Sequence, residues 1–290
     1  MYKEILEQSE VIERTISGRL DTNSDDIPIV SDHASKFEKI WIVACGTAYH
    51  AGLFGKDLFE KVLGVPVSVE LASEFRYREP IVGKNDLGIV ISQSGETMDT
   101  IAATELLKEN GSHVLALVNV VGSSLARMAD SVFYLHVGPE IGVASTKAYL
   151  GMLVSQLVLA KHWDSKNRLD VSFDEIAELP NLIDKTMACE DQIKEISEKI
   201  YKKNDIYFIG RGLDYALAAE GALKLKEISY LHAEALAAGE LKHGTLALIE
   251  EGTPVVVTAS QNHLLDKTTS NVQEVIARGA YVIALSLIHI

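Results

Sequence analysis

Hydroxyl side chains gather at residues 92–97, where the sequence reads Ser-Gln-Ser-Gly-Glu-Thr. An apolar, β-branched run at 87–91 precedes them, and Ile101, Leu106 and Leu107 follow at helical spacing, so the hydroxyls are expected in a strand-to-helix turn. In an open α/β sheet such a turn lies where ligands bind, and the first N–H groups of the helix lack partners. The stretch therefore predicts a site for a phosphate group. Helix capping alone is the alternative, although a cap needs only one hydroxyl.

A second informative stretch is the helix predicted at residues 215–230. Glu220, Lys224 and Glu227 are spaced four and three residues apart and share one face of this helix. A solvated charged face is the simpler interpretation of this spacing. Beside a sugar-phosphate turn, however, Glu227 could move a proton between adjacent carbons while Lys224 stabilises the charge that develops. His243 lies between two glycines and could open a sugar ring, although a lone histidine is more often structural.

Three other candidate sites in the sequence are rejected. His232 and Glu234 have the spacing of a zinc deaminase motif, but no cysteine pair follows, so no metal is expected. Gly210 and Gly212 begin a dinucleotide fingerprint whose third glycine is missing, and no cofactor is expected. Cys45 ends a predicted strand and is interpreted as a small buried residue rather than a nucleophile.

The elements around these residues alternate between strand and helix. This order predicts an α/β fold with parallel sheets flanked by helices, of the flavodoxin-like or Rossmann-like kind. The expected strands lie at 40–44, 67–70, 87–91, 114–118 and 132–136, and the expected helices at 3–20, 49–63, 97–110, 145–163 and 182–202.

The chain repeats itself at an offset of 166 residues. This offset carries Gly46 and Tyr49 onto Gly212 and Tyr215, and it also carries residues 89–92 onto 255–258. We therefore expect two tandem domains, of which the second is incomplete and the chain a fragment. The expected boundaries are a linker helix and loop at 1–34, a first domain at 35–170, a connecting helix at 171–204 and a second domain at 205–290.

Composition limits the possible partners and location. The 290 residues carry a formal charge of −14, which opposes binding to nucleic acid or to an anionic membrane. The start of the chain has no apolar signal sequence, no apolar run reaches the length of a membrane span, and the two cysteines form no CxxC pair. These features predict a cytoplasmic protein.

Four motifs together resemble the sugar isomerase (SIS) region of the glucosamine-6-phosphate synthase family, the isomerising glutamine–fructose-6-phosphate aminotransferases. The likeness covers essentially the whole chain and implies two SIS domains. The motifs are residues 92–97, Glu140-Ile-Gly-Val-Ala-Ser-Thr-Lys147, Glu220-Gly-Ala-Leu-Lys-Leu-Lys-Glu-Ile-Ser229 and Gly239-Glu-Leu-Lys-His-Gly244.

The resemblance also implies roles for single residues. Glu227 is the expected isomerisation base with Lys224 beside it, and His243, reaching in from the partner subunit of a homodimer, is expected to open the sugar ring. Ala48 stands where relatives commonly have serine, so a methyl group replaces one hydroxyl of the family pattern. The residues expected to bind the sugar phosphate are Ser92, Gln93, Ser94 and Thr97, and those expected to line the sugar site are Thr47, Val143 and Ser145.

By the same resemblance, the substrates are fructose 6-phosphate and ammonia, and the product is glucosamine 6-phosphate. Family members take the ammonia from a glutaminase domain, and a lysine in their C-terminal tail forms an imine with the sugar. Neither part is in this sequence, so the chain alone is expected to be a poor catalyst. A non-catalytic SIS module that senses a sugar phosphate and an SIS deglycase or deaminase are the alternatives. A sensor would need the turn at 92–97 but not Glu227, Lys224 and His243.

Overall fold

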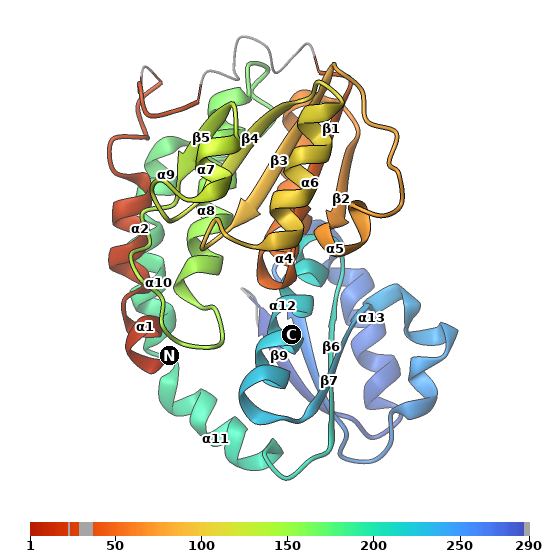
Figure 1. Cartoon of the computed structure of the whole chain (residues 1–290). Coiled ribbons are helices and arrows are strands. Elements are labelled where there is room, and N and C mark those ends of the chain that lie inside the picture. The colour runs from red at the N-terminus through yellow and green to blue at the C-terminus, as the bar shows by residue number, and fades with distance from the viewer. Residues whose placement is uncertain (23, 29–36, 287–290) are drawn as a thin grey trace. The chain divides into compact units, whose positions relative to one another are not determined.

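The computed structural model describes residues 1–22, 24–28 and 37–286 and divides into two compact units (Figure 1). The first unit is Met1–Met187 and the second is Ala188–Ile290. Their border falls inside the segment 171–204, and each unit contains one parallel sheet. In the described part of the chain, no helix is both long and apolar enough to cross a membrane.

The sheet of the first unit has five parallel strands in the order β2-β1-β3-β4-β5. β1 and β3 are neighbours, and Ala44 pairs with Ile91, so both strands end at the same level. This register brings Cys45 and Ser92 to the same edge of the sheet. The strands are β1 (Lys39–Ala44), β2 (Val67–Leu71), β3 (Asp86–Ser92), β4 (His113–Val118) and β5 (Ser131–Tyr134).

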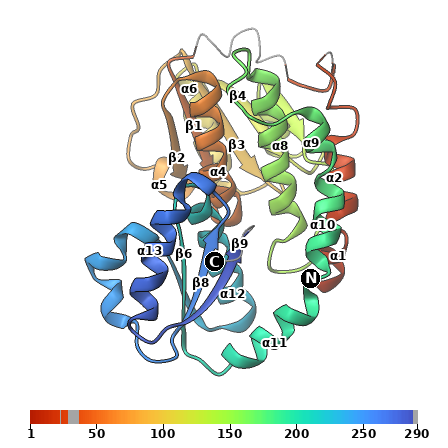
Figure 2. The ribbon, with the colours of Figure 1, turned by 180° about the vertical axis from the view of Figure 1, so that it is seen from behind.

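Both faces of this sheet are covered by helices, because its strands are apolar on both sides. Figures 1 and 2 show α6 and α7 over one face and α4 and α8 over the other. The helices are α1 (Tyr2–Leu6), α2 (Gln8–Ile16), α4 (Gly46–Leu63), α5 (Ala72–Phe75), α6 (Met98–Glu109), α7 (Ser124–Met128), α8 (Lys147–Trp163), α9 (Phe173–Ala177) and α10 (Leu179–Met187).

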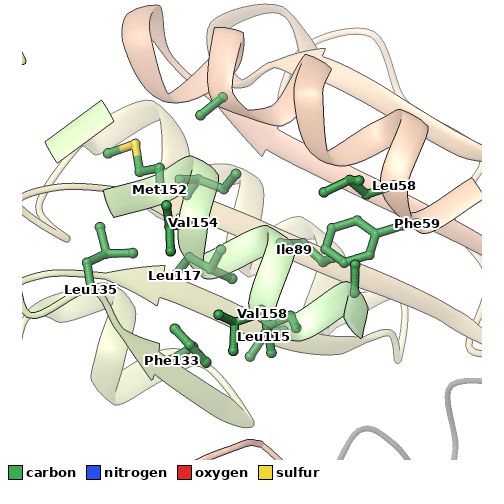
Figure 3. Packing of buried hydrophobic residues seen from close by; sticks show 14 of the residues in the cluster. Leu58, Phe59, Ile89, Leu115, Leu117, Phe133, Leu135, Met152, Val154 and Val158 are labelled. Carbon is green, nitrogen blue, oxygen red and sulfur yellow. The ribbon is translucent and has the colours of Figure 1, made fainter. Parts of the chain in front are cut away.

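Two hydrophobic cores result from the alternation of side chains along these strands. Ile40 and Ile42 of β1 point to the α4 and α8 side, whereas Trp41 and Val43 point to the α6 side. Figure 3 shows the larger core, where Phe59 of α4 and Met152 and Val158 of α8 pack with apolar residues of the strands. The two tryptophans lie in different cores, since Trp41 packs against Phe75 (ring centroids 5.4 Å apart) and Trp163 against Phe59 (5.2 Å).

The second unit has a four-stranded parallel sheet in the order β7-β6-β8-β9. Its strands are β6 (Asp205–Gly210), β7 (His232–Ala237), β8 (Pro254–Ala259) and β9 (Tyr281–Ser286). Its helices are α11 (Glu190–Ile200), α12 (Leu213–Ser229) and α13 (Leu265–Ile276), with short 3₁₀ helices η1 (Ala238–His243), η2 (Thr245–Leu248) and η3 (Asn262–Leu264).

The predicted α/β fold with two parallel sheets is confirmed, and the expected bounds of three elements are wrong. The helix expected at 3–20 is two helices, α1 and α2, and ends at Ile16. The strand expected at 132–136 begins and ends earlier, at Ser131–Tyr134. The single helix expected at 182–202 is two helices, α10 and α11, separated by Ala188 and Cys189. Strand β7 was not expected, because only tertiary pairing with β6 makes this segment a strand. The apolar residues at 287–290 lie outside the described residues.

Candidate functional site

A cavity of about 180 Å³ lies at the carboxyl ends of β1 and β3 in the first unit. This volume suits a phosphate group with part of a sugar, since pockets for larger ligands begin at roughly 300 Å³. Six of the seven residues expected to bind the sugar phosphate line it: Thr47, Ser92, Gln93, Ser94, Thr97 and Ser145. The remaining lining residues are Cys45, Ala48, Ile91 and Met152.

Val143 is the seventh expected residue. It lies in the loop that leads to Ser145, but its side chain is 97% exposed and it is not among the residues that line the cavity. Its place in the sugar site stays a prediction.

The turn after β3 is held in shape by its own hydroxyl groups. Ser92 Oγ accepts a hydrogen bond from the N–H of Gly95 (3.0 Å) and lies 3.1 Å from Thr97 Oγ1. Ser94 Oγ accepts from the N–H of Glu96 (3.2 Å). A preorganised turn of this kind presents hydroxyl and N–H donors without further ordering.

Helix capping does not account for these hydroxyls. Thr97 occupies the N-cap position of α6, yet its side chain makes no capping hydrogen bond. The first N–H groups of α6 are therefore not satisfied by the residue that would normally cap them. An anion at the helix start would accept hydrogen bonds from these N–H groups and would be stabilised by the positive end of the helix dipole.

The loop that carries Ser145 is organised by Glu140, the first residue of one family motif, to which the sequence assigned no role. Ser145 Oγ donates to Glu140 Oε2 (2.9 Å), while the N–H of Thr146 (2.7 Å) and the N–H of Ala148 (3.3 Å) donate to Oε1. Glu140 thus binds the first turn of α8 and fixes the hydroxyl of Ser145. Its spacing of five to eight residues from its partners gives no periodic signal, so only the fold reveals this role.

Two carboxylates of the N-terminal helices hold the same loop from outside. Glu4 accepts hydrogen bonds from the N–H groups of Ile141 (2.6 Å) and Gly142 (3.0 Å). Chiefly because of the Gly142 and then the Ile141 hydrogen bond, the pKa of Glu4 is lowered to about 2. Glu7 pairs with Lys147 (2.6 Å), whose side chain is only 3% exposed, and this lysine lowers the pKa of Glu7.

The second unit contains the groups expected to transfer protons. On α12, Lys224 Nζ lies 2.6 Å from Glu227 Oε2 and 3.3 Å from Glu220 Oε1, as their spacing predicts. A solvated charged face does not describe this cluster, because Glu220 is only 4% exposed. The ammonium of Lys224 thus lies between the two carboxylates on one face of α12. The role of Glu227 as a base stays a prediction.

His243 is the last residue of η1 and is exposed. Gly244 follows it with φ +144°, a conformation that side chains rarely adopt, so the chain turns sharply after the imidazole. The turn at 92–97 belongs to the first unit, whereas Glu227, Lys224 and His243 belong to the second. The structure thus gathers the expected residues into two groups, one in each unit.

His232 of the rejected metal motif begins β7, and its Nδ1 lies 2.8 Å from Asp205 Oδ1 on the neighbouring strand. Across the described ranges, no cluster of three histidine, cysteine or acidic side chains could hold a metal ion. Cys45 was expected to be buried but is only half-buried; it lines the cavity, and its Sγ lies 3.9 Å from Thr100 Oγ1.

A parallel α/β sheet with a hydroxyl-lined cavity at its carboxyl edge is typical of ligand-binding α/β proteins. The family model of the SIS domain matches residues 34–161 and 199–287, so the chain belongs to the SIS domain family and contains two SIS segments. The expectation of two SIS domains is thereby confirmed.

Individual relatives within this family carry a more specific name. The chain is 50% identical over 296 residues to the glutamine–fructose-6-phosphate aminotransferase (isomerizing) of Clostridium tetani, covering 99% of this chain and 49% of that protein. It is 48% identical over 288 residues to the protein of the same name from Pyrococcus horikoshii, covering 98% and 48%. The chain spans about half the length of the curated relatives it matches.

A solved structure covers nearly the whole chain. It is the C-terminal domain of glucosamine-fructose-6-phosphate aminotransferase from Francisella tularensis, which is 41% identical, with a TM-score of 0.87. The match covers 98% of this chain and 83% of that one. The similarity to this region of the aminotransferases agrees with the resemblance found in the four sequence motifs.

Proposed function

We propose that this chain is the sugar-isomerising part of a glutamine–fructose-6-phosphate aminotransferase, which makes glucosamine 6-phosphate from fructose 6-phosphate and glutamine-derived ammonia. The observation that carries the proposal is the hydroxyl-lined cavity at the ends of β1 and β3. The names of the relatives at 48–50% identity supply the substrates. The first unit binds the phosphate, and the second unit supplies the groups that move protons.

The reaction assigns one step to each group. His243 moves the proton of the anomeric hydroxyl to the ring oxygen, which opens the ring. Ammonia adds to the C2 carbonyl, and water leaves to give an imine. Glu227 then takes a proton from C1 and returns a proton to C2, while the imine nitrogen gains a proton and the C1 hydroxyl loses one, which turns the C1 alcohol into an aldehyde and the C2 imine into an amine. Lys224 stabilises the negative charge that develops between these two transfers.

Phosphate recognition is tested by calorimetry with fructose 6-phosphate and with free fructose. The parent chain is expected to bind only the phosphorylated sugar, because each charge-assisted hydrogen bond contributes roughly 1.5–3 kcal/mol. Ser94→Ala should weaken binding of fructose 6-phosphate by about tenfold or more. Ser197→Ala, on an exposed helix of the second unit, is the control and should bind as the parent does. Equal affinity of the parent for both sugars would show that the turn is not a phosphate site.

The role of Glu227 is tested by exchange of the C1 proton of fructose 6-phosphate in deuterium oxide. Glu227→Gln keeps the shape of the side chain and removes the base, so exchange should slow by roughly 100-fold or more while sugar binding persists. Glu198→Gln is a control at an exposed position. Exchange at the parent rate in Glu227→Gln would assign the base elsewhere, and a chain that binds the sugar without any exchange would be a sensor.

The homodimer is part of the same proposal. An exposed His243 at the end of η1 is suited to serve the site of a second copy. Neither Glu227→Gln nor His243→Ala alone should support turnover, but a mixture that forms mixed dimers should recover up to roughly a quarter of the parent rate, because one site in each mixed dimer is then complete. A mixture without any recovery would place His243 in the site of its own chain.

A further inference from the structure

The turns after β1 and β3 have counterparts in the second unit. β6 and β8 are adjacent in their sheet, as β1 and β3 are in theirs. Gly46 and Gly212, which are related by the offset of 166 residues, both have φ +54° and stand at the start of α4 and α12. The turn after β6 therefore repeats the glycine conformation of the turn after β1, whereas Gln261, which the offset pairs with Gly95 (φ +67°), has φ −93°.

The same offset pairs two further positions. Ser94, which lines the cavity of the first unit, corresponds to Ser260, which follows β8. Ala48, which lines that cavity with a methyl group, corresponds to Asp214 on the first turn of α12. A small apolar residue at the anion-binding edge of the first sheet is thus replaced by a carboxylate in the second.

The carboxylate of Asp214 receives the donors that the turn after β8 offers. Ser260 Oγ donates to Oδ1 (2.6 Å), and the N–H of Ser260 lies 3.1 Å from Oδ2 and 3.2 Å from Oδ1. Gln261 Nε2 donates to Oδ2 (3.2 Å) and also to the carbonyl oxygen of Arg211 (2.7 Å), which ties the two turns together. Asp214 is 1% exposed, so this anion is buried.

These contacts explain how a carboxylate can be buried here. Burial of a charge is costly unless charge-assisted hydrogen bonds and dipoles compensate for it, and the start of the 17-residue helix α12 adds its dipole to the three donors. The nearby guanidinium of Arg211 is already bound to Asn271 Oδ1 (2.9 and 3.1 Å). In this site the donors already bind Asp214, so they are not available to a phosphate. The buried negative charge of Asp214 would also repel a phosphate.

We propose that Asp214 is an internal anion that occupies the second unit's counterpart of the phosphate site, so that a sugar phosphate binds only to the first unit. The proposal rests on the proposed function of the turn at 92–97. The identity of the residue at positions 48 and 214 decides whether each site is open: alanine leaves space for an external anion, and aspartate fills it.

A reciprocal pair of variants tests this proposal by calorimetry with fructose 6-phosphate. The parent should bind one molecule per chain. Ala48→Asp should lower affinity at the first site by 100-fold or more, whereas the matched Ala48→Asn, which has the same size without the charge, should lower it less. A parent chain that binds two molecules, or an Ala48→Asp chain that binds as well as Ala48→Asn, would overturn the proposal.

The second arm removes the internal anion. Asp214→Ala leaves the donors of Ser260 and Gln261 without a partner, so its melting temperature should fall and should recover in formate, which has the shape of the lost group. Formamide, a neutral molecule of the same size, is the control and should not restore it. A folded Asp214→Ala that formate does not stabilise more than it stabilises the parent would refute the role of Asp214. This arm does not need sugar binding, so it separates failure of this inference from failure of the proposed function.

Discussion

Gly95 shapes the turn that presents the hydroxyl groups. Its φ of +67° lies in the left-handed region, and a Cβ at this position would lie 2.1 Å from Ser123 Oγ and 2.5 Å from Ser123 Cβ. Ser123 is buried and belongs to the segment that leads into α7. Backbone conformation and close packing therefore both require glycine here.

Gly95→Ala is expected to destabilise the first unit and to weaken sugar-phosphate binding. Gly122→Ala separates the two causes, because Gly122 has nearly the same φ (+71°) but nothing within 4 Å of its Cβ position. Gly122→Ala should lower the free energy of unfolding by about 1 kcal/mol because of its left-handed backbone. Gly95→Ala should lower it by about 1–3 kcal/mol more because its Cβ would overlap Ser123. Urea unfolding of both variants measures the difference, and equal losses would show that Ser123 moves aside freely.

Glu140 positions the hydroxyl of Ser145 through a charged hydrogen bond. Two N–H groups and two hydroxyls donate hydrogen bonds to the Glu140 carboxylate. Glu140→Gln keeps the side-chain length but removes the negative charge, so binding of fructose 6-phosphate should weaken by about tenfold. Glu109→Gln, at the exposed end of α6, should leave the affinity unchanged. Calorimetry would contradict this role if both variants bound like the parent.

At the scale of elements, α1 and α2 connect the start of the chain with the loop before α8. Glu4 binds Ile141 and Gly142 across 137 and 138 residues of sequence, and Glu7 binds Lys147 across 140. Packing cannot compensate for the loss of these contacts, because a buried lysine and two loop N–H groups would be left without partners. The two helices thus contribute to the order of the loop that carries Ser145.

This connection predicts a pH dependence. The pKa of Glu4 is lowered to about 2 from its usual value of 4.5, so its ionised form stabilises the folded state above pH 4.5 and this stabilisation is lost as the pH falls toward 2. Glu4→Gln should therefore be less stable than the parent at pH 6 and should lose less stability between pH 5 and 2. Urea unfolding at several pH values measures both. Parallel pH profiles would show that Glu4 does not hold the loop.

The elements also show what the sequence could predict. β1 and β3 were predictable because β-branched, apolar runs favour buried strands, and α12 because its charged residues recur at helical spacing. β7 has the sequence His-Ala-Glu-Ala-Leu-Ala, which has little strand propensity and becomes a strand only through its pairing with β6. The contacts of Glu4, Glu140 and Asp214 join residues that no periodic pattern relates, so they required the structure.

The whole molecule contains two copies of one fold whose corresponding turns, after β3 and after β8, have different chemistry. Hydrogen exchange measured by mass spectrometry should therefore detect fructose 6-phosphate at one turn only. Residues 92–97 and the loop at 138–146 should gain protection when the sugar is added, whereas the turn at 260–264 should exchange at an unchanged rate. Free fructose is the control. Equal protection of both turns would mean that the two units bind the sugar alike.

The positions of the two tryptophans give the first unit an optical signal of its own. Trp41 and Trp163 are both buried in the cores of this unit, and the 290 residues contain no other tryptophan. Intrinsic fluorescence excited at the indole band therefore reports the unfolding of the first unit alone, whereas far-ultraviolet circular dichroism follows helices of both. The difference between the two midpoints in a single urea titration measures how far the stabilities of the duplicated halves differ.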